Sequence, residues 1–291
     1  MSSLSYGYNV RSERLRVMGL HELVAFLLLI AVVCWMIFPR DLSTTLRNAR
    51  LDAVTFSYMQ AWLKAKPNDD ELRLLMAREL ILLGRFREAE DQLALIAGHG
   101  HFHDGDVSWL RLLKDFYRLM ALPPRDRIGT MLEYETVERL NAVDWGALTR
   151  EQREEFAEMA LALNQAEAAA NAYGRIAVQS DTPAQWHERA ARVQLAHGNY
   201  LAAATSYIRA MDARGDYDVR KTYFLSAMDV LVAGGLHGQA LALAERRERS
   251  FLDDKEVVYR LMLLAQSGGD MTRAERYAVI LLNLPGAEAS R

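Results

Sequence analysis

The stretch "LAHGNYLAAATSY", residues 195–207, contains a glycine, an aromatic residue and an alanine in the order Gly198-x-Tyr200-x-x-Ala203. Glycine readily adopts the positive φ that a tight turn between two helices requires. Alanine is small enough to let two helices approach closely. Tyr207 follows Ala203 by four residues and therefore lies on the same helical face. The stretch predicts a helix, a tight turn and a second helix packed against the first.

The same pattern recurs along the chain. Its other copies are Gly84-x-Phe86-x-x-Ala89, Gly235-x-His237-x-x-Ala240, Gly269-x-Met271-x-x-Ala274 and, more weakly, Asn164-x-Ala166-x-x-Ala169. From 164 to 198 is 34 residues, from 198 to 235 is 37, and from 235 to 269 is 34. This period and pattern resemble the tetratricopeptide repeat (TPR), a helix-turn-helix unit. The resemblance covers about residues 43–103 and 150–286 and implies an all-α, TPR-like helical-hairpin solenoid.

Helix boundaries are signalled by residues outside the repeat pattern. In "SYMQAWLKAKPNDDELRLL", residues 57–75, a proline ends one helix, and Asp69 or Asp70 can cap the next. Thr149 and Gln152 have the spacing of a capping box, and Pro183 suits the first position of a helix. These signals predict three helix starts.

Residues 104–149 do not keep the repeat spacing, because Gly84 and Asn164 are 80 residues apart. The stretch "DVSWLRLLKDFYRLMAL" is typical of an amphipathic helix, Pro123 and Pro124 interrupt it, and "RIGTMLEYETVERLNAV" is typical of another. We therefore expect an irregular helical pair between the two repeat regions.

An apolar segment precedes the repeats. In "LHELVAFLLLIAVVCWMIFP", residues 20–39, an uncharged run of 16 residues extends from Leu23 to Phe38, and a bilayer core needs about 20 helical residues. The alternatives are a cleaved signal peptide, for which no small-residue cleavage site follows, and a buried soluble helix. Residues 17–39 predict a single-pass transmembrane helix after a short polar tail, residues 1–16. We expect the repeats on the periplasmic side of a bacterial inner membrane, although arginines flank the segment equally.

Composition limits the remaining possibilities. Hydrophobic residues make up 51% of the 291 residues and charged residues 25%, which is enough for a sizeable core. The net charge of −3 gives no general case for binding nucleic acid. The single cysteine, Cys34, excludes an intramolecular disulfide and a cysteine-rich metal site.

The sequence "GHGHFHDGD", residues 98–106, brings together His99, His101, His103, Asp104 and Asp106. Imidazole and carboxylate groups are good zinc ligands, so a weak metal site or a metal-dependent enzyme is one interpretation. The alternating spacing lacks the i, i+4 arrangement of helical metal ligands. We expect a solvated loop between repeats, in which Asp104 or Asp106 caps the next helix. Since the chain also lacks phosphate-loop, nucleophile-elbow and dinucleotide motifs, we predict neither an enzyme nor a cofactor.

The TPR resemblance also implies a groove lined by the first helix of each hairpin. Its inward positions are Glu151, Glu154 and Glu158 in one repeat and Gln185, Glu188 and Arg192 in the next. These residues make part of the groove acidic and suit a basic peptide or a cationic polymer. The alternative is a merely solvated helix face.

The order of anchor and repeats, with the stretch "AWLKAKPNDDELRLLMARELILLGRFREAE", residues 61–90, resembles the TPR region of Pel-type exopolysaccharide export proteins. That resemblance implies a scaffold that binds polymer or other envelope proteins. The chain departs from the family because it has no outer-membrane barrel. An assembly scaffold for pilus, secretion or translocon machinery is the alternative.

Overall fold

The structure is a computed structural model that describes Val24, Leu28, Leu29 and residues 53–97 and 103–284. In these residues the chain forms 14 α-helices, two short 3-10 helices and no strand, so the all-α prediction is confirmed for them. The chain divides into two compact units, residues 1–79 and 80–291. Each unit is described below by itself.

In the first unit, helix α3 (Ala53–Ala65) is followed by the beginning of α4 (Asp70–Leu82). As predicted, Asp69 caps α4, because its Oδ1 accepts a hydrogen bond from the backbone N–H of Leu72 at 3.1 Å. Its Oδ2 also accepts from the indole N–H of Trp62 at 3.3 Å. The guanidinium of Arg73 donates to the carbonyl of Pro67. These contacts fix the proline turn between the two helices.

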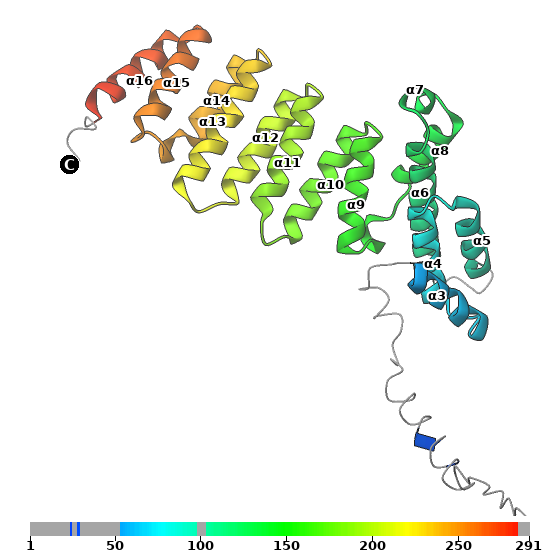
Figure 1. Ribbon diagram of the computed structural model, residues 1–291. Helices are drawn as coiled ribbons and strands as arrows, with labels where there is room; N and C mark the ends of the chain where they lie inside the picture. The colour runs from blue at the N-terminus through cyan, green and yellow to red at the C-terminus, as the bar shows by residue number, and fades with distance from the viewer. Residues whose placement is uncertain (1–23, 25–27, 30–52, 98–102, 285–291) are drawn as a thin grey trace, which may run out of the picture. The chain divides into compact units, whose positions relative to one another are not determined.

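Helical hairpins make up most of the second unit, and in its C-terminal part they follow one another in a row (Figure 1). Each helix from α9 to α16 packs against the next one in the chain. The helices of this unit, with its two 3-10 helices, are α5 (Phe86–Ala97), α6 (Asp104–Met120), α7 (Pro124–Arg127), α8 (Met131–Asn141), η2 (Trp145–Ala147), α9 (Arg150–Ala162), α10 (Ala166–Gln179), α11 (Pro183–Ala196), α12 (Tyr200–Asp212), α13 (Tyr217–Ala233), α14 (His237–Arg247), η3 (Glu248–Ser250), α15 (Lys255–Ser267) and α16 (Met271–Asn283).

The five turn residues identified in the sequence share one backbone conformation. Their φ angles are positive: 74° at Gly84, 58° at Asn164, 73° at Gly198, 72° at Gly235 and 76° at Gly269. At each turn the N–H of the following residue reaches back five residues to a helix carbonyl, at 2.8 or 2.9 Å. This bond is the mark of a Schellman motif, which ends a helix with a left-handed residue. The weaker copy at Asn164 is thus a turn of the same geometry, because asparagine tolerates that conformation.

The alanines of the pattern are buried. Ala89, Ala169, Ala203 and Ala240 are fully buried, and Ala274 is 4% exposed. Ala203, Ala240 and Ala274 belong to one hydrophobic cluster, which also includes Phe224 on α13 and Leu261 on α15.

Aromatic residues connect successive hairpins. The ring of Tyr200 lies against Gly234, where a Cβ atom would approach the ring to 2.6 Å. The rings of Tyr207 and Tyr223 stack with their centroids 6.4 Å apart, and those of Tyr173 and Trp186 stack with their centroids 5.9 Å apart. A side chain at Gly234 would therefore displace Tyr200 from the end of α13.

The capping residue proposed for α6 is wrong. Helix α6 begins at Asp104 and His103 occupies its N-cap position, without a side-chain hydrogen bond to the backbone. Asp104 and Asp106 lie inside the first turn, where a carboxylate is favoured by the helix dipole but cannot act as the N-cap. The expected loop therefore ends at His103.

Residues 104–149 contain the two expected helices, α6 and α8, together with a short helix, α7, that the pattern did not predict. Pro124 is the first residue of α7, and Thr130 caps α8 by accepting from the N–H of Glu133. The capping box of Thr149 and Gln152 on α9 is confirmed by both of its hydrogen bonds.

Several sequence predictions lie outside the described residues. These are the structure of most of segment 17–39, the environment of Cys34, and the positions of His99 and His101. Within the part of the chain that the structure describes, no helix combines the length and the apolar character needed to cross a bilayer.

Candidate functional site

The predicted groove residues lie on the first helices of two successive hairpins. We call the surface formed by Glu151, Glu154 and Glu158 on α9 and by Gln185, Glu188 and Arg192 on α11 the A-helix face. On each helix the spacings of three and four residues keep the three side chains on one side.

The α9 part of the A-helix face is acidic and open to solvent. Glu151 and Glu158 are exposed. Glu154 lies 3.7 Å from the guanidinium of Arg150, one helical turn away, with 41% of its side chain exposed. An exposed pair of this kind contributes little to stability and leaves the carboxylate accessible. Three carboxylates thus line one side of α9.

On α11, by contrast, the acidic side chain is already bound. One carboxylate oxygen of Glu188 lies 2.5 Å from the guanidinium of Arg192. The other oxygen accepts a hydrogen bond from the hydroxyl of Tyr223 on α13, at 3.0 Å. Burial, and then the contact with Glu188, raise the pKa of the Tyr223 hydroxyl, so it remains a donor at neutral pH. The structure therefore brings Glu188 into a contact between helices rather than leaving it free for a partner.

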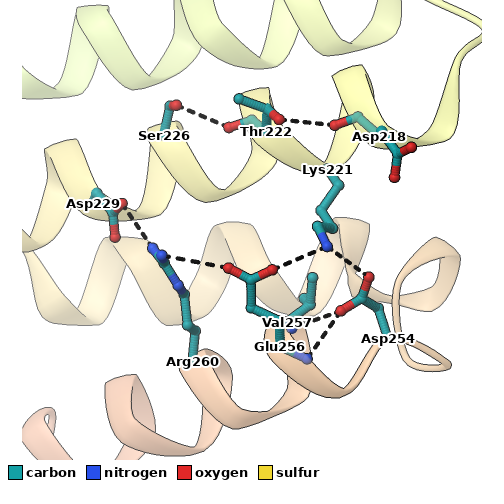
Figure 2. A network of polar contacts seen from close by, with 9 residues as sticks. All are labelled: Asp218, Lys221, Thr222, Ser226, Asp229, Asp254, Glu256, Val257 and Arg260. Carbon is teal, nitrogen blue, oxygen red and sulfur yellow. Dashed lines mark hydrogen bonds and ion pairs between the residues drawn. The ribbon is translucent and has the colours of Figure 1, made fainter. Parts of the chain in front are cut away.

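A network of ion pairs connects α13 with α15, which are the first helices of the last two hairpins (Figure 2). The ammonium of Lys221 lies 3.0 Å from carboxylates of both Asp254 and Glu256. The guanidinium of Arg260 lies 3.0 Å from Asp229 and 3.6 Å from Glu256. Lys221 on α13 thus pairs with carboxylates at α15. Arg260 on α15 pairs with one carboxylate on α13 and one on its own helix.

The same network shifts the pKa of Asp254. Burial alone would raise that pKa, but the hydrogen bond and charge of Lys221 and the backbone N–H groups of Val257 and Glu256 hold it below its usual range. Asp254 also caps α15 through those N–H groups. Its charge is thus used within the fold, and every carboxylate of the network on α13 and α15 is paired with Lys221 or Arg260. Within the A-helix face, the exposed carboxylates are therefore those on α9.

The sequence did not reveal these pairs, although it contained one signal. Glu151, Gln185, Thr222 and Glu256 all stand 13 residues before a turn residue, so they occupy equivalent places on successive first helices. Lys221 stands one position before Thr222, so it carries a charge opposite to that of Glu256 at nearly the same place on the preceding first helix, and the two form an ion pair.

The histidine-rich stretch shows no metal geometry where it is described. Nδ1 of His103 lies 3.6 Å from a carboxylate oxygen of Asp106. Among the described residues, no three His, Cys, Asp or Glu side chains are arranged to hold a metal ion. His99 and His101 lie outside those residues, so their part in a metal site stays untested.

Helix α11 carries a second polar surface that the sequence analysis did not identify. His187, Ala190 and Gln194 each follow a residue of the A-helix face by two positions, which turns them to the other side of the helix. They line a hollow whose other walls are α10 and α12.

The chain was also compared with known proteins. No model of a known protein family matches it, and no curated protein matches it either.

Proposed function

We propose that this protein is a membrane-anchored scaffold of TPR-like helical hairpins that binds protein or polymer partners in a bacterial cell envelope. One observation carries the proposal: five turns, at Gly84, Asn164, Gly198, Gly235 and Gly269, share the same positive φ and the same reach-back hydrogen bond. A chain that repeats one hairpin in this way exposes a long surface relative to its core, and such arrays act as binding surfaces.

The A-helix face is the surface that we propose for a basic partner. Its carboxylates on α9 are exposed, and the nearest cation that pairs with them is Arg150, at 3.7 Å. Opposite charge on a partner raises the rate of association more than the final affinity. A basic peptide or a cationic polymer is therefore the class of partner that this face suits.

The proposal places residues 17–39 in the inner membrane and the repeats in the periplasm. The first statement rests on the apolar sequence of that segment, and the second on the absence of a cleavage site and on the short arginine-bearing tail before it. The resemblance to the TPR region of Pel-type export proteins makes exopolysaccharide export the first process to examine. Catalysis is not part of the proposal.

Affinity purification of the full chain from native membranes, followed by mass spectrometry, tests the function. The matched control carries Glu151→Gln, Glu154→Gln and Glu158→Gln. We expect envelope proteins that are recovered with the wild type and depleted with the variant. Recovery of cytoplasmic proteins alone, or the same proteins with both baits, would contradict the proposal.

A reporter fused after Arg291 tests the membrane topology separately. We expect a periplasmic reporter, such as a secreted phosphatase, to be active and a cytoplasmic one to be inactive. The reverse result would place the repeats in the cytoplasm.

A further inference from the structure

A hollow of about 600 Å³ lies among α10, α11 and α12. Its polar lining consists of Arg175, Arg209, His187, Asn171, Gln194 and Ser206. A second hollow of about 340 Å³ shares Gln194, Ser206 and Arg209 with it and continues along α12 past Asn199. We call the two together the α10–α12 groove. Pockets that bind ligands usually enclose about 300–1,000 Å³, so the groove has room for several groups of a ligand.

The groove exists because polar and small residues replace large apolar ones. His187 and Gln194 stand 11 and 4 residues before the turn at Gly198. In the next hairpin the equivalent residues are Phe224 and Leu231, which are 0% and 1% exposed. On α10, a Cβ added to Gly174 would have no atom within 4 Å. The space that a core side chain fills in the next hairpin is thus open here and polar.

Positive charge in the groove comes from two guanidinium groups. Arg175 and Arg209 both stand 11 residues after a turn residue, on successive second helices. Arg175 lies over the ring of Trp145, with its Cζ 5.5 Å from the centroid, which leaves the edge of the guanidinium free to donate. Arg209 is exposed. Neither hollow has an Asp or Glu among its lining residues.

The neutral side chains of the groove offer mainly donors. Oε1 of Gln194 accepts from the hydroxyl of Ser206 at 2.8 Å, so the amide NH₂ of Gln194 is the group left to bind a ligand. Oδ1 of Asn199 caps α12 by accepting from the N–H of Ala202, which leaves its NH₂ in the same way. Burial, and then the charge of Arg209, lower the pKa of His187. A groove of donors and positive charge suits a ligand of acceptors and negative charge.

We infer that the α10–α12 groove binds an acidic peptide segment of a partner protein, with carboxylates on Arg175 and Arg209 and peptide carbonyls on the amides of Gln194 and Asn199. Arginine binds carboxylates through two parallel hydrogen bonds, so two arginines fix two acidic side chains. The continuation of the groove along α12 favours an extended chain over a compact molecule. Neither hollow has a phenylalanine, tyrosine or tryptophan among its lining residues for the base stacking that single-stranded nucleic acid uses.

This surface is distinct from the A-helix face, and its partner has the opposite charge. Failure of the groove to bind an acidic peptide would therefore leave the proposed function of the A-helix face unaffected.

Fluorescence anisotropy of a labelled peptide of alternating glutamate and glycine tests the inference on the full chain in non-ionic detergent. We expect the peptide to bind, with an affinity that falls as salt rises, and the corresponding lysine–glycine peptide not to compete. The double variant Arg175→Gln/Arg209→Gln should weaken binding about tenfold or more, the effect of losing hydrogen bonds to charged groups.

Two further variants separate the groove from general charge. Gly174→Leu fills the hollow without changing charge, and leucine favours the helix more than glycine does, so it should abolish binding without lowering the melting temperature. Arg246→Gln is the matched control, because Arg246 stands at the equivalent position on α14 and does not line the groove. Full binding by Gly174→Leu, or equal losses in Arg246→Gln and the double variant, would overturn the inference.

The class of ligand is tested by competition. A phosphoserine–glycine peptide or a polyuronate chain that displaces the acidic peptide at a much lower concentration would replace the proposed partner by a phosphorylated protein or an acidic polysaccharide. Competition no stronger than that of the unlabelled acidic peptide supports the inference.

Discussion

Nε2 of His197 lies 2.9 Å from Oδ1 of Asn164, so the turns of two successive hairpins touch. Asn164 is the one turn residue of the five that is not glycine, and its φ is 58°. His197 immediately precedes the next turn residue, Gly198, and its Nδ1 lies 3.0 Å from the carbonyl of Val193. The pair joins equivalent points of two repeats.

Replacing Asn164 separates backbone conformation from this contact. Both Asn164→Gly and Asn164→Ala remove the contact with His197, but only alanine meets the left-handed conformation with an unfavourable Cβ, at a cost of about 1–2 kcal/mol. We expect the free energy of unfolding to fall more for alanine than for glycine, by about 1 kcal/mol. Urea unfolding of the full chain measures it. His197→Ala measures the contribution of the contact alone to the free energy of unfolding. If Asn164→Ala were as stable as Asn164→Gly, the turn assignment would be contradicted.

An arginine at a buried pattern alanine should prevent the hairpin from closing. Ala240 is fully buried, whereas Ala242 on the same helix is exposed. We expect Ala240→Arg to destabilise the protein by more than about 3 kcal/mol, because overpacking adds to the burial of a charge. Ala242→Arg, the matched control, should change stability by less than about 0.5 kcal/mol. Thermal unfolding followed by circular dichroism measures both, and similar melting temperatures would count against a close helix contact at Ala240.

Stability should depend on pH through Glu90. Burial opposes ionisation of this carboxyl, but hydrogen bonds and charge from Lys114 and Arg111 outweigh it and lower the pKa below 4.5. The folded pKa is depressed, so the stabilisation is present above pH 4.5 and disappears as pH falls through the folded pKa. With 38% of the Glu90 side chain exposed, we expect Glu90→Gln to cost below about 1 kcal/mol at pH 7.

Urea unfolding midpoints of wild type and Glu90→Gln between pH 7 and pH 3 check this dependence. The difference between the two proteins should shrink toward zero at the acidic end. Asp91→Asn is the control, because Asp91 is the exposed neighbouring carboxylate, and it should produce a smaller difference at every pH. A Glu90→Gln difference that stays constant with pH would indicate lost packing instead of a lost ion pair.

The acidic part of the A-helix face should steer a basic partner. Glu151→Gln, Glu154→Gln and Glu158→Gln together should slow the association of a labelled lysine–glycine peptide and flatten its dependence on salt, because the summed field sets the encounter rate. Each single change should have a small effect, since exposed charges are screened over about 8–10 Å. Stopped-flow fluorescence measures the rates. Glu188→Gln should change stability more than the rate, because Tyr223 and Arg192 already bind that carboxylate.

A control variant keeps the same change in net charge on other exposed carboxylates. This variant combines Asp126→Asn, Glu138→Gln and Glu275→Gln. The three residues are exposed and lie on α7, α8 and α16. If this control slows association as much as the A-helix variant does, the effect belongs to overall charge, and the face has no special part in binding.

The sequence predicted the local features of the fold because each depends on residues a few positions apart. The positive φ at Gly198 and the capping box of Thr149 and Gln152 are examples: both close within five residues, so their residue types and spacing suffice to indicate them. The buried alanine five residues after each turn residue follows from the same local register.

Only the tertiary structure decided which side chains meet across the hairpins. Glu188 reaches Tyr223 over 35 positions, and Arg260 reaches Asp229 over 31. Such contacts depend on how neighbouring helices pack, which a repeat pattern leaves open. For the same reason, the A-helix face was placed on α9 and α11 from the sequence, whereas the groove that His187 and Gln194 form beside α10 and α12 was not. A polar residue at a core position of one repeat signals such a hollow, but its walls come from helices that the sequence alone does not bring together.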